Sequence, residues 1–404
     1  MRSITPTKNL RSGQTVWSFT RHRPLLTHGL KGAVKCDVAI IGAGVSGAFM
    51  AEELSRHYGN VVVLDRRAPA SGSTHASTAM LQYEIDTPLT ELADRMGWAR
   101  AARVWRLSAK TVQDMIRLIR RERIACDLQT RNSLYLAGDA MGSRGLAGEA
   151  RARHRAGLEC QFLNAAALNA RFGIARTGAI HSSGHASADP VALARGLLRR
   201  ARSRGAHIYA PCDVTGVLAN HKGVMLNAGG HFIEARAAVF CTGYERLTAV
   251  PDSGTRIVSS WAAATGPHSD YPDWLDRTLV WEAADPYLYM RSDGQGRLIV
   301  GGEDAGLDSP GLRARTLGGK ARMLAAKTKA LFGVKPHWKH VWAGAFGDSA
   351  DGLPVIDAVP GLPHCFAVMG FGGNGTIYSR MAAKLMPGLI KGRPSPNARL
   401  FFYR

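Results

Sequence analysis

The chain has 404 residues, enough for two or three domains of ordinary size. Its 46% hydrophobic and 21% charged residues exclude a largely disordered protein, and its 45 glycines follow no three-residue period, which excludes collagen. The net charge of +21 is concentrated in residues 95–204, where 21 Lys and Arg stand against 7 Asp and Glu. A positive electrostatic field of this kind favours anionic partners. Solvated arginine-rich helix faces are the simpler explanation of the charge, so we expect no specific nucleic-acid partner.

The six cysteines lie far apart and form no Cys-x-x-Cys pair, so we expect neither a metal site nor a secreted disulfide framework. The first 30 residues contain no apolar segment typical of a secretory signal. The longest apolar run near the start, residues 38–45, is too short and too rich in glycine to span a bilayer. The sequence therefore predicts a cytoplasmic protein without a membrane span.

The predicted elements begin after a polar N-terminal arm, residues 1–35, in which Trp17 and Phe19 are expected to be isolated anchors. A buried strand, a helix and a second apolar strand follow as one β-α-β unit, which implies a parallel sheet: residues 37–41, 45–58 and 61–64. The apolar period then predicts helix over residues 89–124. Asp189 and Pro190 form a helix start, and this helix is expected to end near Gly205.

Short apolar runs separated by turn residues follow this helix. They are expected to be strands of a meander that leads back into the parallel sheet: residues 214–219, 224–227, 231–234 and 237–241. Residues 287–290 and 297–300 are expected to pair as an antiparallel hairpin. The chain closes with a glycine-rich loop, residues 370–375, and a helix over residues 376–391.

The first turn of the β-α-β unit carries the pattern G-x-G-x-x-G, with glycines at Gly42, Gly44 and Gly47. The first glycine allows a tight turn, the second lets the backbone approach a pyrophosphate, and the third lets the helix pack closely on the strand. Asp65 ends the next strand 18 residues after Gly47, where a carboxylate accepts hydrogen bonds from a ribose. Because the amides at a helix N-terminus also stabilise phosphates, the unit predicts dinucleotide binding.

Three further segments favour FAD over NAD. Residues 70–79 are small and rich in hydroxyl groups, which suits a loop that holds phosphate and the isoalloxazine ring. The predicted strand that ends at Cys241 leads into Thr242 and Gly243, as if a later strand returned to the same ligand. The loop over residues 370–375 opens the last helix, so its free amides are placed to stabilise negative charge on the N1–C2=O edge of a reduced flavin.

With these segments the chain resembles the D-amino-acid-oxidase-like (DAO) family of FAD-dependent oxidoreductases, over about residues 36–404. Besides the glycine turn, the likeness rests on five short segments: residues 72–77, 241–243, 342–344, 351–354 and 370–375. The chain is most similar to the bacterial branch that holds glycine oxidases, sarcosine oxidases and gamma-glutamylputrescine oxidoreductases. The resemblance implies an α/β fold, with a Rossmann-like FAD-binding domain in discontinuous segments and a substrate domain built on an antiparallel sheet.

The resemblance also implies a division of the chain and a set of cofactor-binding residues. The expected parts are the N-terminal arm (1–35), the FAD-binding domain (36–88, 180–255 and 340–404) and the substrate domain (89–179 and 256–339). The residues expected to bind FAD are Gly42, Gly44, Val45, Ser46, Gly47, Asp65, Arg66, Gly72, Ser73, Thr74, Ser77, Thr78, Ala79, Met80, Val214, Thr242, Gly243, Gly344, Phe371, Gly372, Gly373, Asn374, Gly375 and Thr376.

The activity that the resemblance implies is oxidation of a C–N bond in a small amine or amino acid, by hydride transfer to flavin N5 and hydrolysis of the resulting imine. The electron acceptor, oxygen or another, stays open, because Ile299 stands where sarcosine oxidases hold an oxygen-activating lysine. Two alternatives remain. One is oxidation of a 2-hydroxy acid; the other is flavin-dependent RNA modification, which the missing methyltransferase domain and the lack of aromatic residues among the basic ones disfavour.

Several positions depart from the family pattern. Gly344 stands where some relatives attach FAD to a cysteine, and His75 lies one residue from the histidine that others use, so we expect non-covalent FAD. Phe346 replaces the arginine that binds substrate carboxylate in glycine-oxidase-like relatives. Gln82 and Ile377 replace the arginine and lysine that sarcosine oxidases use for the same purpose.

The remaining candidates lie near the loop over residues 70–79, called the flavin loop below, and on the predicted hairpin. Arg291 is a possible substitute carboxylate clamp or a solvated strand residue. Glu84 and Asp86 either pair with a cationic amine, cap the next helix or lie at the surface. Tyr287 and Tyr289 point to one face, which is either the flavin cavity or the core. No catalytic residue is assigned; the candidates are His75, Tyr289 and Arg291, and the substrate-binding candidates are Gln82, Glu84, Tyr287 and Phe346.

Overall fold

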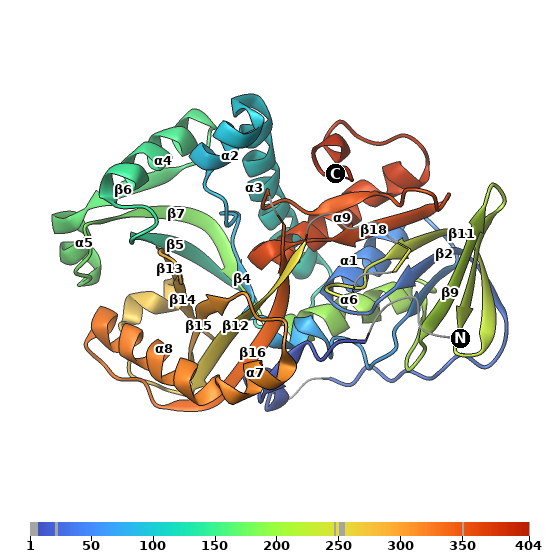
Figure 1. The fold of residues 1–404 in the computed structure, drawn as a ribbon, viewed down its shortest axis with the longest axis horizontal. Coiled ribbons are helices and arrows are strands. Elements are labelled where there is room, and N and C mark those ends of the chain that lie inside the picture. Colours follow the sequence, from blue (N-terminus) through green and yellow to red (C-terminus); the bar gives the residue numbers. More distant parts are fainter. Residues whose placement is uncertain (1–6, 21–22, 246–247, 250–254, 350, 404) are drawn as a thin grey trace.

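The computed structural model describes residues 7–20, 23–245, 248–249, 255–349 and 351–403, which form two neighbouring sheets with helices around them (Figure 1). The other residues of the expected arm and of the expected FAD-binding segments lie outside the described residues: 1–6, 21–22, 246–247, 250–254, 350 and 404. Within the described part, ten strands belong to one sheet and eight to the other.

The smaller sheet contains the predicted β-α-β unit. Its path is β17 (Val355–Ala358), β18 (Cys365–Met369), β11 (His231–Phe240), β2 (Val34–Ile41), β3 (Val61–Leu64) and β8 (His207–Tyr209). All of these run parallel except β17, and β11 also pairs antiparallel with β10 (Gly223–Ala228), which pairs with β9 (Val214–Asn220). Val38 and Ile40 pack on one face of the sheet and Ala39 on the other, so β2 is buried on both sides.

Three helices form the core on one face of this sheet: α1 (Val45–Leu54), α6 (Pro190–Ser203) and α9 (Gly375–Ile390). Helix α6 begins as predicted, since the Asp189 side chain accepts hydrogen bonds from the amides of Val191 and Ala192, and Pro190 is its first residue. Helix α1 ends at Leu54, four residues before the expected end.

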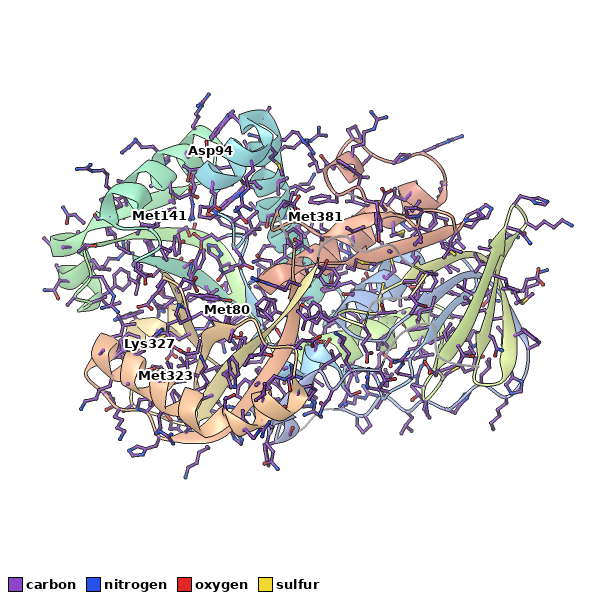
Figure 2. The ribbon with its side chains drawn as sticks, in the orientation of Figure 1. Met80, Asp94, Met141, Met323, Lys327 and Met381 are labelled. Atoms are coloured by element: carbon purple, nitrogen blue, oxygen red, sulfur yellow. The ribbon has the colours of Figure 1, made fainter. Side chains whose placement is uncertain are left out.

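The larger sheet is antiparallel apart from one parallel pair, β13 with β5. Its path is β1 (Arg11–Gly13), β16 (Trp338–Asp348), β12 (Arg256–Thr265), β15 (Leu298–Ala305), β14 (Leu288–Ser292), β13 (Thr278–Ala283), β5 (Gln129–Ala137), β7 (Gly178–Ser187) and β4 (Met80–Leu81), with β6 (Cys160–Asn164) beside β7. The predicted hairpin is confirmed as β14 and β15, in which Met290 pairs with Val300. Met80 lies near the centre of the molecule, where β4 begins (Figure 2).

The remaining helices cover this larger sheet and its outer end: α2 (Leu89–Met96), α3 (Trp98–Arg121), α4 (Ser143–Arg155), α5 (Ala165–Phe172), α7 (Pro310–Arg315) and α8 (Leu317–Phe332) (Figure 1). Helix α8 packs on one face, where Leu324 meets Val280, Met290 and Val300. Because side chains alternate along a strand, the neighbours of these residues, such as Trp281 and Tyr289, point to the opposite face.

Four expectations are wrong. Part of the N-terminal arm enters the sheet: β1 pairs with β16, and Trp17 is buried with its Nε1 donating to the Ser77 carbonyl at 2.8 Å. A strand can pair through its backbone without an apolar pattern, so the polar sequence did not indicate that residues 11–13 form a strand. Phe19, expected as a second anchor, is 58% exposed. The expected helix over residues 89–124 is two helices, because Gly97 has φ +84°, a conformation that breaks a helix.

The last correction concerns strand boundaries. The two expected strands over residues 231–234 and 237–241 are the single strand β11. Strands β7 and β16 both pair in the larger sheet, although residues 180 and 340 were expected to begin segments of the FAD-binding domain. The sheets thus divide the chain differently, and the domain assignment stays a prediction.

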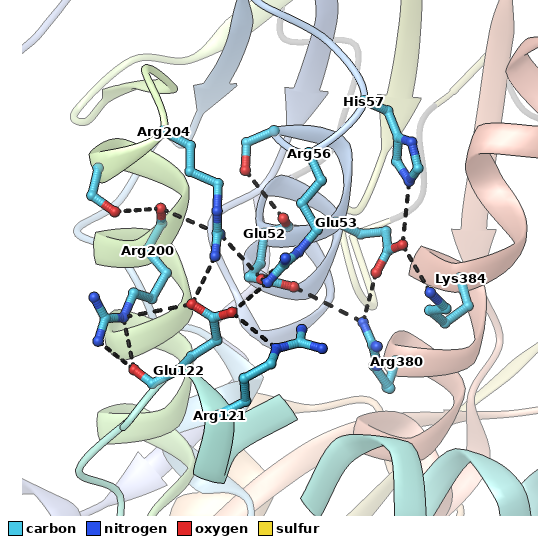
Figure 3. A network of polar contacts seen from close by, with 12 residues as sticks. Glu52, Glu53, Arg56, His57, Arg121, Glu122, Arg200, Arg204, Arg380 and Lys384 are labelled. Atoms are coloured by element: carbon cyan, nitrogen blue, oxygen red, sulfur yellow. Dashed lines mark hydrogen bonds and ion pairs between the residues drawn. The ribbon is translucent and has the colours of Figure 1, made fainter. Parts of the chain in front are cut away.

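A charged network ties α1, α6 and α9 to the end of α3 (Figure 3). Arg204 donates to the buried Glu52 at 3.1 Å and to Glu122 at 2.7 Å, and Arg56 pairs with both carboxylates. Arg380 pairs with Glu53 at 2.9 Å. Part of the positive charge of residues 95–204 is therefore used to hold helices together.

Candidate functional site

A cavity lies where the carboxyl ends of the parallel strands face the larger sheet. Its wall on one side comes from the turns after β2, β3 and β11, and on the other from strand residues such as Ser260, Trp281 and Phe346. In α/β sheets this edge is where dinucleotides bind. Tyr287 and Tyr289 line the cavity too, so the face they share is the cavity face rather than the closed core.

The G-x-G-x-x-G turn has the geometry that its glycines predict. Gly42 has φ +109°, and a Cβ there would collide with the Cys241 carbonyl oxygen. A Cβ on Gly47 would collide with the Gly42 carbonyl oxygen, so Gly47 serves the close packing of helix on strand and does not line the cavity. Helix α1 begins at Val45, whose amide donates to Thr74 Oγ1 at 2.9 Å, and this contact fixes the flavin loop against the turn.

Asp65 lines the cavity and also braces the turn. Its Oδ2 accepts a hydrogen bond from the Ala43 amide at 2.6 Å, and its Oδ1 accepts one from the Arg67 amide at 2.7 Å. Burial raises the pKa of Asp65, against the effect of these two amides. Each oxygen retains acceptor capacity for a ribose hydroxyl.

Asp65→Ala is expected to weaken FAD binding by about 1.5–3 kcal/mol, which is roughly 10- to 150-fold in Kd, because both the ribose acceptor and the brace of the turn are lost. Flavin fluorescence on dilution of the holoenzyme measures the effect. Asp37→Ala is the matched control, since Asp37 lies near the opposite end of β2 and bonds the Asn60 amide. Equal Kd values for the two variants would refute the role of Asp65.

Charged residues that the sequence analysis missed line the same end of the cavity. Arg67 pairs with Glu245 through two contacts of 2.5 and 2.7 Å, and Arg66 donates to Asp213 at 3.0 Å. Arg66 was expected here. Arg67 lies two residues after Asp65, so its place in the sequence could have indicated that it lines the cavity too. Glu245 and Asp213 come from distant segments, so no local pattern indicated them.

The cavity fits a large phosphate-bearing cofactor. Ser73 Oγ is buried, lines the cavity and has no hydrogen-bond partner among the described residues. A Cβ on Gly344 would come within 2.9 Å of the Ala76 Cβ, and a Cβ on Gly373 within 2.9 Å of Asp86 Oδ2. Neighbouring residues therefore leave no room for a side chain at either glycine, and both glycines line the cavity. Of the residues expected to bind FAD, all but Gly47 line the cavity.

His75 does not line the cavity in the described structure. Its Nδ1 lies 2.8 Å from Thr15 Oγ1, so the ring faces the N-terminal segment. This placement argues against His75 as a catalytic residue or a covalent anchor, and non-covalent FAD stays the prediction.

Arg291 also lies outside the cavity wall. Its buried guanidinium donates to the Thr78 carbonyl at 2.6 Å and the Ala188 carbonyl at 2.9 Å, and it stacks on the Trp17 ring at 5.5 Å. Burial lowers the pKa of Arg291 to about 10. Arg291 therefore braces the flavin loop, and the expectation of a substitute carboxylate clamp is wrong. Pattern alone could not show this, because its acceptors are backbone carbonyls.

Glu84 is fully buried and belongs to an internal ion pair, not to the cavity wall. Its Oε1 pairs with Arg153, which also donates to Glu149 at 2.9 Å. Its Oε2 accepts from Ser133 and, at 3.3 Å, from Trp281 Nε1. Burial raises the pKa of Glu84, but Arg153, His185, Ser133 and Ser182 together more than offset this, so that the pKa is lowered. Glu84 thus positions Trp281 and does not bind a substrate amine directly.

Gln82, Asp86 and Phe346 do line the cavity. Asp86 Oδ2 accepts a hydrogen bond from the Gly373 amide at 2.7 Å, and the Asp86 amide donates to Asn374 Oδ1 at 3.0 Å. These contacts hold the glycine loop at the start of α9. Ser260, Trp281 and Tyr244 complete this end, and the sequence analysis missed them.

A dinucleotide turn whose cavity continues onto an antiparallel sheet defines the class of FAD-dependent oxidoreductases. The model of the DAO family, described as FAD dependent oxidoreductase, matches residues 37–387. The chain belongs to this family, and its cofactor is FAD. The predicted fold class and cofactor are thereby confirmed.

Individual relatives agree with this assignment. A glycine oxidase of Geobacillus kaustophilus is 25% identical over 372 residues, 88% of this chain and 93% of the relative. The sarcosine oxidase subunit beta of Rhizobium meliloti is 25% identical over 334 residues, 80% of this chain and 77% of the relative. The crystal structure of glycine oxidase from Geobacillus kaustophilus superimposes with a TM-score of 0.77 at 21% identity, covering 92% of this chain and 99% of that chain.

Among the described residues, every helix is too short or too polar to cross a bilayer. No group of three or more His, Cys, Asp and Glu side chains there is arranged to hold a metal ion.

Proposed function

We propose that the protein oxidises a C–N bond of a small amine or amino acid. The observation that carries the proposal is the shared cavity, in which the dinucleotide end opens onto a wall of Tyr287, Tyr289, Trp281 and Phe346. When bound, the cofactor supplies the hydride acceptor for a C–H bond beside nitrogen, and water hydrolyses the imine that results. Small-amine and amino-acid relatives such as glycine oxidase support the same reaction class.

The residues of this chain have three tasks in that reaction. Asp65 and the glycine turn bind the dinucleotide, and the amides at the start of α9, held by Asp86, face the cavity where negative charge would develop. Arg291 fixes the loop around Thr78. The aromatic wall excludes water, which strengthens the electrostatic interactions within the cavity.

The test is anaerobic bleaching of the flavin absorption by a panel of amines, amino acids and 2-hydroxy acids. We expect at least one amine or amino acid to bleach the flavin, with a rate that reaches a plateau as the substrate concentration rises. Bleaching by 2-hydroxy acids alone would replace the proposal with hydroxy-acid oxidation. Bleaching by no member of a broad amine panel would refute C–N oxidation.

A further inference from the structure

We propose that the substrate end of the cavity selects an organic ammonium that carries no neighbouring carboxylate, with Asp304 as the residue that sets this specificity and Gln82 as a hydrogen-bond acceptor. The inference rests on the proposed function and names the substrate class of the same site. Three sets of contacts support it.

The first is the distribution of charge around the cavity. Among the described lining residues the cations are Arg66 and Arg67, and both pair with acids at the dinucleotide end. Gln82, Phe346 and Ile377 line the cavity without carrying a charge, and Arg291 is bound to backbone carbonyls. A substrate carboxylate at this end would therefore be desolvated without a cation among the described lining residues, which is strongly unfavourable.

The second is a buried acceptor that lacks a donor. Gln82 is 7% exposed and lines the cavity, and its Oε1 has no hydrogen-bond partner among the described residues. Its Nε2 donates to the Glu84 carbonyl at 3.4 Å, which sets the direction of the amide. Because an unpaired buried acceptor is costly, a ligand N–H group is the complement that the site requires.

The third is a strained bulge that positions Asp304. Ser259 pairs with Ala305 and Trp261 with Gly302, so two residues of β15, Glu303 and Asp304, face the single residue Ser260 of β12. Glu303 has φ +59°, which is uncommon for a residue with a side chain. Bulges with such strain occur preferentially near active sites, where they redirect a side chain.

Two lysines of α8 hold this bulge in place. Lys320 donates to the Glu303 carbonyl at 2.8 Å, and Lys327 pairs with the Glu303 carboxylate at 2.5 Å. Lys327 extends from α8 at the side of the larger sheet (Figure 2). Both lysines thus pair with Glu303, and Lys320 also lowers the pKa of the neighbouring Asp304, which interacts with the cavity-wall residues Ser260 and Tyr287.

Asp304 stands behind the cavity wall made by Ser260, Tyr287 and Tyr289. Its Oδ1 is buried and has no hydrogen-bond partner among the described residues. Burial raises the pKa of Asp304 to about 6, although Ser260 and Tyr287 oppose the shift. A cationic ligand in front of this wall would stabilise the carboxylate, and the tyrosine rings would add favourable contacts with the cation.

The test uses the oxidised holoenzyme and two probes of similar shape and opposite charge. Benzyltrimethylammonium is a permanent cation that cannot form an imine, and benzoate is its anionic counterpart. Binding is followed by the change in flavin absorption. We expect the cation to bind at least 10-fold more tightly than benzoate. Tighter binding of benzoate would overturn the inference, and so would equal binding.

Variants separate Asp304 from a general charge effect. Asp304→Asn is expected to weaken binding of the cation at least 10-fold at pH 8 while flavin content stays unchanged. Asp308→Asn is the matched control, because Asp308 is exposed, lies four residues away and pairs with Lys8. An unchanged affinity in Asp304→Asn would overturn its role. If Asp304→Asn fails to fold, the wild-type comparison of the two probes still decides the inference, and Gln82→Leu is expected to slow bleaching by N-methylisobutylamine, which carries an N–H group.

A substrate pair distinguishes this inference from the proposed function. N-methylisobutylamine differs from sarcosine in having an isopropyl group in place of the carboxylate. Faster anaerobic bleaching by the amine supports both statements. Faster bleaching by sarcosine overturns the inference and leaves C–N oxidation standing. Binding of the cation probe without bleaching by any amine or amino acid supports the cationic site and refutes C–N oxidation.

Discussion

Replacing Arg153 by methionine is expected to lower the free energy of unfolding by about 3–5 kcal/mol, the range for breaking a buried ion pair by removing one partner. Arg153 is fully buried between Glu84 and Glu149, so the substitution leaves two carboxylates without their cation. Arg153 also lies over the Trp105 ring at 4.7 Å, a contact that methionine only partly replaces. Urea unfolding at saturating FAD measures the change without a contribution from cofactor loss.

Two controls make this result specific. Arg155→Met removes an arginine two residues further along α4, where it is exposed and stacks on Trp98, and should change the free energy by less than about 1 kcal/mol. Combining Arg153→Met with Glu84→Gln should recover part of the loss, because one stranded charge is removed. If the Arg153→Met single variant is as stable as Arg155→Met, the buried network contributes little to the free energy of unfolding.

Asp304→Asn is expected to stabilise the protein by about 3 kcal/mol at pH 8 and to have little effect below pH 4. The pKa of Asp304 is about 6 in the folded chain against an ordinary 3.8, since burial disfavours its charged form. Well below pH 3.8 the group is protonated whether the chain is folded or not. Between about pH 3.8 and 6 the unfolded chain ionises this carboxyl while the folded chain keeps it protonated, so the destabilisation grows by about 1.4 kcal/mol for each unit of pH and is fully present above pH 6.

The charged and polar groups around Asp304 determine the size of this effect. Asp86 raises the pKa further, whereas Lys320, Ser260 and Tyr287 lower it. The measurement is the difference in unfolding free energy between wild type and variant at pH 4 and pH 8, without added amine. Asp308→Asn should show no such pH-dependent gain. Equal differences at the two pH values would contradict the buried carboxylate.

With this result, Asp304 would be a residue that lowers the stability of the fold in return for recognition of a cation. The same substitution is expected to stabilise the fold and to remove recognition of a cation, which is the trade-off often seen at binding sites. Since a cationic ligand favours the ionised carboxylate, the stabilising effect of the substitution should shrink when benzyltrimethylammonium is present.

Much of the cofactor site could be predicted because its signals are local. The tight turn at Gly42 and the acid at Asp65 are separated by one helix and one strand, and their spacing alone implies their meeting. Tyr287 and Tyr289 were correctly placed on one face because a strand has a period of two. Whether that face was cavity or core depended on the neighbouring strands, which no local pattern specifies.

The parts that could not be predicted depend on distant partners. Glu84 has the position of a substrate residue in the sequence, yet Arg153, 69 residues away, makes it an internal ion pair. Asp304 gave no signal at all, because its direction follows from a bulge that exists only when β12 and β15 pair. The strand at Arg11–Gly13 was missed for a related reason, since its partner is β16 near the other end of the chain.

The cavity draws its walls from Leu10 at one end of the chain to Ile377 at the other. During synthesis the ribosome must therefore release almost the whole polypeptide before this cavity can close. The residues of the dinucleotide turn leave the ribosome early, whereas β11 and α9, which complete the cavity, leave it much later. Cofactor loading is consequently a late event in biogenesis, and the yield of holoenzyme in a cell should depend on the supply of FAD at the time the chain is completed.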